Sequence, residues 1–401
     1  MKQLLAYCLS IILCVSFTGC MENYLDLYPE DKITSASFPE NESDIKLLLN
    51  GVYAQLREKE VYNQGLFGFG ITDGATPNAF NWGTDEVFNK LGAGRLSSSD
   101  GGVVTYRWKR CYEIISRANY LLACMDLVDL SEEAKAKYSG ETHFLRGLAY
   151  SVLAETYGGV PIILTNISTE EARSLKRASL EETWQQALDD YEVAITNLGV
   201  DAPEPGRATK GAALGMKMRA YLYQGKYKEV LACVEQIDAL KKYGLFHSYE
   251  GLFDPANENN KEVLFDIQYI EGENSQGSYI DQYCGTGTGS WTRGSRYVPT
   301  DDLVAAYETI DGSPVDPENP YENRDPRLGF TAVLPGSYFL GYRFPNYLYP
   351  GGAFNHAGNR LKHLSTRKYR IQDESKLPPS GQSYINDIIL RYAAVSYTHL
   401  R

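Results

Sequence analysis

Apolar residues recur at intervals of three and four along the first part of the chain, between residues 45 and 241. This spacing is typical of one face of an amphipathic helix. The positions that keep it are Ile45, Leu48, Leu49, Val52 and Leu56, then Ile114, Ile115, Ala118, Leu121 and Leu122, then Phe144, Leu148 and Val152. The pattern therefore predicts a helix in each of these three segments.

Residues that commonly end or begin helices separate the apolar runs. The run that starts at Phe144 stops at Gly158-Gly159, and Pro161 stands just beyond, where a proline cannot continue the helix. Ser179 and Glu182 have the spacing of a capping box, in which the side chain of each residue accepts a hydrogen bond from the backbone N–H of the other. We therefore expect a second long helix from residue 180 to about residue 198.

Two more helices are expected over residues 209–224 and 227–241, joined across Gly225. Gly158 and Gly225 are 67 residues apart, close to twice the ~34-residue period of tetratricopeptide repeats. Residues 20–245 are therefore predicted to form a stack of helical hairpins of tetratricopeptide-like type.

The helical periodicity fades after residue 245 into glycine, proline and aromatic residues. A short run at residues 263–267 has the composition of a strand. Long irregular segments of an ordered domain often carry functional surface. We expect residues 246–385 to be an irregular ligand-binding region, and residues 386–393 to begin a terminal helix.

The first 19 residues have the pattern of a secretion signal. Lys2 is followed by an apolar run from Leu4 to Phe17, which is too short to span a bilayer, and then by small residues before Cys20. The sequence around Cys20 resembles a bacterial lipobox, although Phe17 stands where leucine is commonest. The resemblance implies a lipid-anchored Cys20. The alternative is an ordinary secreted protein with a free or paired Cys20.

Composition narrows the possible functions. The net charge is -12, which makes nucleic acid an unsuitable partner. Four cysteines remain after Cys20, with no CxxC pair, so neither a disulfide scaffold nor a zinc site is indicated, and Cys111, Cys124 and Cys233 are expected to be small buried side chains. The 31 tyrosines are an unusual number, and they suit wet interfaces and sugar recognition because the ring is apolar on its face and polar at its tip.

Six blocks of the sequence occur in the order found in one protein family. They are Cys20 to Leu27 with Leu47–Tyr53, then Trp108–Leu122, Phe144–Pro161, Gly206–Ala213, Asn323–Arg327 and Ile388–Ala393. In these blocks the chain resembles the SusD/RagB family of outer-membrane lipoproteins over nearly all of its length after Cys20.

The resemblance implies a mainly α fold, a tetratricopeptide-like superhelix with a loop-rich C-terminal region. It also implies a glycan-binding lipoprotein, anchored in the outer membrane and facing the exterior, that partners a SusC-like TonB-dependent transporter in nutrient uptake. Catalysis, metals and cofactors, apart from the lipid on Cys20, are not part of that expectation.

Two loops combine aromatic residues with side chains that can bind sugar hydroxyls. The candidate glycan-binding residues are Asp73, Asn78, Phe80 and Trp82 in the first loop, and Tyr283, Trp291 and Arg293 in the second. The alternative is that both tryptophans fill gaps between loops and core, and that the polar residues cap turns.

Other aromatic and histidine residues favour structural roles. Trp108 and Trp184 stand inside helical patterns and are expected in the core, and His143 is expected to be structural. The aromatic residues between Tyr338 and Tyr349 are expected to pack an irregular insertion, with a contribution to ligand or transporter binding as the alternative.

Two other functional classes remain open on the sequence. A surface glycoside hydrolase needs a pair of facing carboxylates, but none of the 51 acidic residues is singled out by its spacing. Five scattered histidines include no HExxH motif of a metal hydrolase. A helical adaptor that binds protein through its repeats is the second alternative.

The end of the chain departs from the family pattern at residues 394–401, which look foreign to it. The resemblance implies further helices after residue 393. A repeat stack that lacks its terminal unit exposes apolar surface, so we expect a chain extended by those helices to be more stable than this one.

Overall fold

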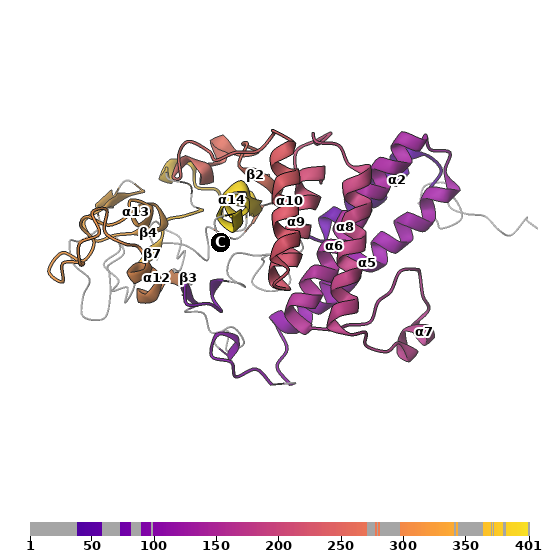
Figure 1. Cartoon of the computed structure of the whole chain (residues 1–401), viewed down its shortest axis with the longest axis horizontal. Coiled ribbons are helices and arrows are strands. Elements are labelled where there is room, and N and C mark those ends of the chain that lie inside the picture. Colours follow the sequence, from indigo (N-terminus) through magenta and orange to yellow (C-terminus); the bar gives the residue numbers. More distant parts are fainter. Residues whose placement is uncertain are drawn as a thin grey trace, which may run out of the picture.

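The computed structural model describes residues 38–57, 73–81, 90–97, 99–270, 277–278, 280, 297–340, 342–343, 364–369, 371, 373–379 and 382–399. Residues 42–57 and 103–245 are mainly helical, and we call them the helical array. Residues 246–399 contain short strands and turns and are called the C-terminal part. Figure 1 shows the two side by side, with the helical array on the right.

In the residues that the structure describes, six helices form the body of the helical array, and helices that follow one another along the chain pack together. They are α2 (Glu42–Ala54), α5 (Val103–Cys124), α6 (Glu132–Tyr157), α8 (Leu180–Asn197), α9 (Lys210–Tyr223) and α10 (Tyr227–Ala239). A short helix, α7 (Thr169–Ser174), lies on an excursion at the edge of the array (Figure 1). The predicted stack of helical hairpins is confirmed, because each apolar stripe named from the sequence faces this one core.

The helix ends follow the sequence as well. Ser179 and Glu182 form the expected capping box at the start of α8. Helix α6 ends at Gly158 with a φ of 76°, and the turn between α9 and α10 contains Gly225 with a φ of 69°. Residues with a side chain rarely adopt this left-handed region, so glycine is required at both turns.

A buried ion pair joins three helices of the array. The Arg146 guanidinium of α6 lies 2.7 Å from the Asp190 carboxylate of α8, and it also donates a hydrogen bond to Asn119 of α5. Asn119 in turn donates to the carbonyl of Ile163, which follows α6. Next to the pair, a Cβ on Gly147 would lie 3.1 Å from the carbonyl oxygen of Ala187, so α6 and α8 approach closely there.

The cysteine and histidine expectations are confirmed for the residues described. Cys111, Cys124 and Cys233 are free and buried. Burial raises the pKa of the Cys111 thiol to about 12, so it stays protonated and inert. His143 binds the Ser139 carbonyl within its own helix. Trp184 is buried, and Trp108 is partly buried between Tyr112 and Tyr157.

A two-stranded ribbon connects the C-terminal part to the helical array. Strand β2 (Val263–Ile267) pairs antiparallel with β8 (Asp387–Arg391), and the ribbon packs on α9. The approach is close, because a Cβ on Gly215 of α9 would lie 2.3 Å from a methyl group of Leu390. The strand-like run at residues 263–267 is thereby confirmed.

The expectation that residues 386–393 begin a helix is wrong. Residues 387–391 form β8, because their short apolar run Ile388 to Leu390 finds a partner strand in β2. Helix α14 (Tyr392–His399) follows directly and packs on α10, with Val395 fully buried. Residues 392–399 are therefore helical. A foreign origin of residues 394–401 stays a prediction.

The rest of the C-terminal part is built from small pieces. Strand β1 (Ala79–Asn81) pairs with β3 (Tyr297–Pro299), β4 (Ala332–Val333) with β7 (Ser365–Thr366), and β5 (Tyr338–Phe339) with β6 (Tyr342–Arg343). The described residues of this part also include two short helices, α12 (Asp301–Ala306) and α13 (Arg327–Thr331), and 3-10 turns at Gly251–Phe253, Pro255–Asn257 and Glu374–Lys376. A further 3-10 turn, Met125–Leu127, follows α5. Phe253, Tyr369 and Ile385 belong to a separate small core beside the ribbon.

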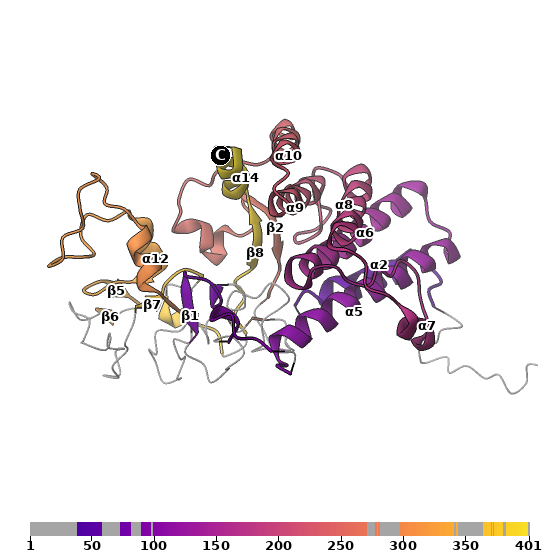
Figure 2. The same ribbon diagram turned by 60° about the horizontal axis from the view of Figure 1, so that its bottom comes forward.

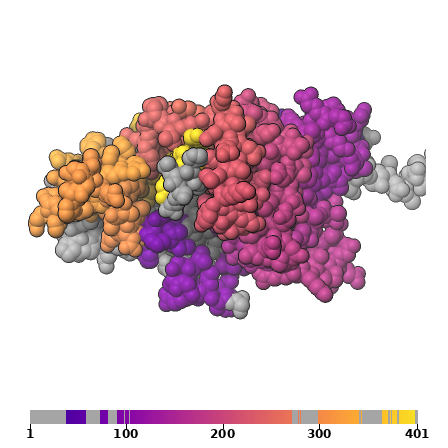
Figure 3. All heavy atoms as spheres, viewed as in Figure 1, coloured from indigo at the N-terminus to yellow at the C-terminus, as the bar shows by residue number. Residues whose placement is uncertain are grey.

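The segment that contains residues 73–81 lies between the two parts of the molecule, although it precedes most of the helical array in sequence. Figure 2 shows β1 beside the C-terminal part, and Figure 3 shows this segment on the surface between that part and the helices. Of the helices in the described ranges, none is long and apolar enough to cross a membrane.

Candidate functional site

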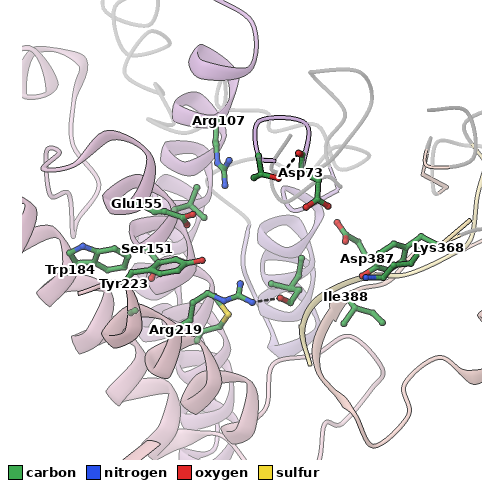
Figure 4. Close-up of a pocket in the computed structure, with 16 residues that line it drawn as sticks. Asp73, Arg107, Ser151, Glu155, Trp184, Arg219, Tyr223, Lys368, Asp387 and Ile388 are labelled. Atoms are coloured by element: carbon green, nitrogen blue, oxygen red, sulfur yellow. Dashed lines mark hydrogen bonds between the residues drawn. The ribbon is translucent and has the colours of Figure 1, made fainter. Parts of the chain in front are cut away.

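A cavity of about 460 Å³ lies where the helical array meets the C-terminal part. Helices α5, α6, α8 and α9 supply one wall, which we call the helical wall. The loop at residues 73–76, the segment around Lys368 and strand β8 supply the opposite wall (Figure 4). Cavities between two parts of a fold are common positions for ligand sites.

Helical periodicity brings the residues of the helical wall together. Ser151 and Glu155 are four residues apart on α6, and Arg219 and Tyr223 are four apart on α9, so each pair lies on one helix face. The Tyr223 side chain is about half exposed, at 53%. Its ring meets that of Trp184 edge to face, with centroids 6.4 Å apart. These two rings form an aromatic corner on the helical wall.

The opposite wall is held by the ribbon and the small core. Asp387 is the first residue of β8 and pairs with Ile267. The Tyr369 ring is buried in the small core. The Lys368 ammonium stands over two rings, 4.5 Å from the centroid of Phe253 and 5.0 Å from that of Tyr369. Such cation–π contacts fix the position of the lysine without neutralising its charge.

Burial shifts the proton affinities of this wall. Burial, together with the nearby carboxylates of Asp266 and Asp73, raises the pKa of Asp387 to about 7. Burial also raises the pKa of Asp73, against the opposing effect of Lys368. The pKa of Lys368 is lowered to about 8 by burial and by the nearby charge of Arg391. Groups with shifted pKa values that face a cavity are typical of functional sites.

Of the residues predicted from the sequence, Asp73 lines the cavity. Asn78 and Phe80 do not line it among the described contacts, and both are exposed, Phe80 on strand β1. Trp82, Tyr283, Trp291 and Arg293, together with Cys20, lie outside the described residues. Their proposed roles stay predictions.

The end of the first loop that the sequence singled out pairs with strand β3, which follows the second. Ala79 is paired with Pro299 and Phe80 with Val298, and Thr300 donates a backbone hydrogen bond of 3.1 Å to the carbonyl of Asn78. The end of the first loop is therefore joined to the residues that directly follow the second.

Sequence reasoning missed most of the cavity. Arg107, Glu155, Arg219, Lys368 and Asp387 were not candidates, because a charged residue on a helix or at a strand end is usually solvated. The helical spacing of Ser151 with Glu155 would have shown only that they share a face. Trp184 is buried as expected, yet it also contributes to the cavity wall.

A second cavity of about 310 Å³ lies between α2, residues 205–207 and the end of β2. Its Arg207 donates hydrogen bonds to Asn50 and Glu141, and its Tyr53 hydroxyl donates to Glu141. Its Asp266 carboxylate accepts hydrogen bonds from Gln268 and Asn386. These polar groups are already used in holding the fold together.

Comparison with known proteins gives one consistent result. A family profile described as "Starch-binding associating with outer membrane" matches residues 23–222, and one described as "SusD family" matches residues 261–398. SusD-like protein P25 of Formosa agariphila is 26% identical over 321 residues, which cover 74% of this chain and 58% of that protein. The chain thus spans a little over half the length of the curated relatives it matches.

Solved structures agree with the profiles. A SusD-like carbohydrate-binding protein of Bacteroides fragilis has a TM-score of 0.78 at 26% identity, with 90% of this chain and 73% of that chain covered. A protein described as a laminarin-binding SusD-like protein has a TM-score of 0.64 at 19% identity, with 90% and 79% covered. At that identity the second comparison shows a shared fold.

Proposed function

The chain belongs to the SusD/RagB family, and from this premise we propose that it is a glycan-binding protein whose site is the cavity between the helical array and the C-terminal part. The observation that carries the proposal is the combination of an aromatic corner on one wall with charged side chains on both. Sugar rings stack on aromatic faces through their C–H groups, and their hydroxyls take hydrogen bonds from the surrounding polar groups.

Two features of the molecule support this position for the site. The cavity is lined by Asp73, from the first of the two loops with a sugar-binding composition. The pairing of β1 with β3 joins that loop to the end of the second. The proposal keeps Asn78, Phe80, Trp82, Tyr283, Trp291 and Arg293 as further candidate glycan-binding residues.

The wider role rests on the family. We propose that Cys20 carries a lipid that anchors the chain in the outer membrane, facing the exterior, and that the protein partners a SusC-like TonB-dependent transporter without cutting the glycan. One matching profile is described as associating with the outer membrane, which supports this location. The relatives are described as binding carbohydrate, which supports a role without catalysis.

Two exposed tyrosines provide a matched test of the site. Tyr223 lines the cavity, whereas Tyr227, four residues later and 67% exposed, does not. The purified protein is screened on a glycan array, and the affinity of each hit is measured by calorimetry. Tyr223→Ala should weaken binding roughly tenfold or more, the effect of losing a stacking ring, and Tyr227→Ala should leave it unchanged. Equal affinities of both variants and the parent would place the site elsewhere.

The same hits decide between binding and hydrolysis. The protein is incubated with each bound glycan, and released reducing ends are counted over a day. Binding without release supports the proposal. Release that disappears in an Asp73→Asn, Asp387→Asn double variant would instead make the cavity a hydrolase site, since these two carboxylates point into it (Figure 4).

Anchoring and partnership are tested in cells. Cys20→Ala should move the protein from the membrane fraction to the soluble exported fraction and abolish labelling by a palmitate analogue. A tagged wild-type protein, solubilised in mild detergent, should copurify with a TonB-dependent transporter. Retention of the Cys20→Ala variant in the membrane would contradict the lipid anchor.

A further inference from the structure

Six charged side chains among the described residues line the proposed glycan cavity, and no ion pair joins any two of them. Three are acidic, Asp73, Glu155 and Asp387, and three are basic, Arg107, Arg219 and Lys368. Arg219 donates a hydrogen bond to the backbone carbonyl of Ile389, and Lys368 stands over aromatic rings. Arg219 and Lys368 are thus held in position without an ion pair to another side chain of the site.

This arrangement differs from the rest of the helical array. Arg110, one turn after Arg107 on α5, donates to Gln55 and Glu113. Arg146 is paired with Asp190, and Lys217 with Glu192. Buried charges are normally paired because an unpaired one costs free energy. Among the described residues of the cavity, Glu155 is exposed, whereas the half-buried Asp73, Asp387, Arg107 and Lys368 have no ion-pair partner there and depart from this rule with both signs of charge.

Arg107 shows the departure most clearly. Its Nε is buried from solvent and has no hydrogen-bond partner. No described residue accepts a hydrogen bond from the rest of its guanidinium, which points into the cavity near Glu155 and the Asp73 loop (Figure 4). A buried donor without a partner is destabilising until an acceptor arrives. The missing acceptor can be supplied by a ligand in the cavity.

The mixture of signs restricts what that ligand can be. A carboxylate or sulfate group only accepts hydrogen bonds, so it would suit Arg107 but would face three carboxylates. An ammonium group only donates, and it would face three cations. A hydroxyl group donates and accepts at once, so a row of hydroxyls can satisfy both sets of side chains.

We propose that the unpaired charges of the cavity select a neutral oligosaccharide, and that Arg107 donates hydrogen bonds to its hydroxyl oxygens. This inference rests on the proposed glycan-binding function and adds the class of glycan and a residue that recognises it. Asp73, Glu155 and Asp387 accept hydrogen bonds from the same or neighbouring hydroxyls.

The ligand class is tested with one sugar backbone in three charge states. A neutral oligosaccharide that the protein binds is converted to its C6-carboxylate and its C6-amino derivatives, and the three affinities are compared. Both charged forms should bind at least tenfold more weakly, since each meets unpaired charges of its own sign. The neutral form should lose less than twofold in affinity between 50 and 500 mM salt, because it brings no charge to screen. Equal or tighter binding of either charged form overturns the inference and leaves glycan binding intact.

The role of Arg107 is tested with a neighbour on the same helix. Arg107→Met keeps the aliphatic stem, and Lys109→Met removes an exposed charge that does not line the cavity. Arg107→Met should weaken neutral-glycan binding roughly tenfold or more, the effect of losing hydrogen bonds to a charged group, and Lys109→Met should have no effect. Arg107→Lys, which keeps the charge but not the planar donor geometry, should fall between the two. Unchanged affinity in Arg107→Met refutes the assignment, and no binding of any glycan by the parent refutes the proposed function itself.

Discussion

Two cavities lie along the junction of the helical array with the C-terminal part, and both contain arginine, carboxylate and tyrosine side chains. In the smaller one, Arg207 is bonded to Asn50, Glu141 and Glu204. In the larger one, Arg107 has no such partner in the described part of the chain, and its Nε is buried. Similar residues therefore serve the fold in one place, and in the other they remain available to a ligand.

The comparison shows how a binding site can be recognised in a protein that holds no ligand. Polar groups that stabilise a fold are satisfied within it, because folding would otherwise lose free energy by burying them. A cavity whose charges are positioned but unsatisfied carries that cost until a ligand binds. We therefore expect substitutions of satisfied polar groups to lower stability, and substitutions of the unsatisfied charges in the larger cavity to weaken ligand binding instead.

The largest effect is expected at the buried pair inside the helical array. Asp190→Ala leaves the Arg146 guanidinium buried with only its bond to Asn119. The free energy of unfolding should fall by about 3–5 kcal/mol, the usual cost of removing one partner of a buried ion pair. Urea unfolding followed by circular dichroism measures it. A loss below 1 kcal/mol would show that the pairing does not support the array.

A smaller loss is expected at the second cavity. Arg207→Met removes the cation beside Glu141, a side chain that is 1% exposed. Glu141 keeps its hydrogen bond from Tyr53, so we expect about 1–3 kcal/mol of destabilisation. Glycan affinity, measured on the folded fraction, should not change. A variant that keeps its stability but loses glycan binding would make the smaller cavity the binding site.

The free energy of unfolding should depend on pH because of Asp387, on the wall of the larger cavity opposite the helical wall. The pKa of Asp387 is about 7 in the folded chain and about 3.9 in an unfolded one. Between these values the folded state holds a proton that the unfolded state has released, so the free energy of unfolding falls as the pH rises from about 4 to about 7.

Asp387→Asn should therefore flatten the pH dependence of stability, and it should raise stability above pH 7 relative to the parent. Glu258, whose pKa is also raised to about 7, mainly by burial, should account for part of the slope that remains. Thermal melts at half-unit steps from pH 4 to pH 8 provide the measurement. An unchanged slope in the variant would mean that Asp387 is already ionised at low pH.

The smallest effect on stability is expected at Arg107. Because the fold gives its buried Nε no hydrogen-bond partner in the described residues, Arg107→Met should not lower the free energy of unfolding and should raise it by up to about 1 kcal/mol. The same variant should lose glycan affinity, as argued above. A large loss of stability would place Arg107 with Arg207 among the structural arginines and remove the contrast between the cavities.

Much of the helical array could be predicted from the sequence. The stripes at Ile45, Ile114 and Phe144, the capping box at Ser179 and the stop at Gly158 are local patterns, and the structure confirms each. A helix needs only its own residues and one apolar face to be recognised. Asp73 was found for a similar reason, since its loop has the composition of a binding surface.

The prediction was wrong where local sequence left a choice. The run from Ile388 to Leu390 is apolar and short, and such a run fits a helix or a buried strand equally well. This run forms a strand because it pairs with residues 263–267, which lie more than a hundred residues earlier in the chain. Helix α14 then begins at Tyr392, whose hydroxyl donates to Asp238 of α10.

The sequence by itself determined the family, the helical hairpins and the loop that contributes Asp73, because repeated spacing and short motifs are properties of neighbouring residues. Only the tertiary structure decided which charges are satisfied. Arg107 and Arg110 look alike in the sequence, yet one faces a cavity and the other faces Gln55 and Glu113. Whether a charged group finds a partner depends on which distant segments fold against it, and the described residues around Arg107 leave its buried Nε without one.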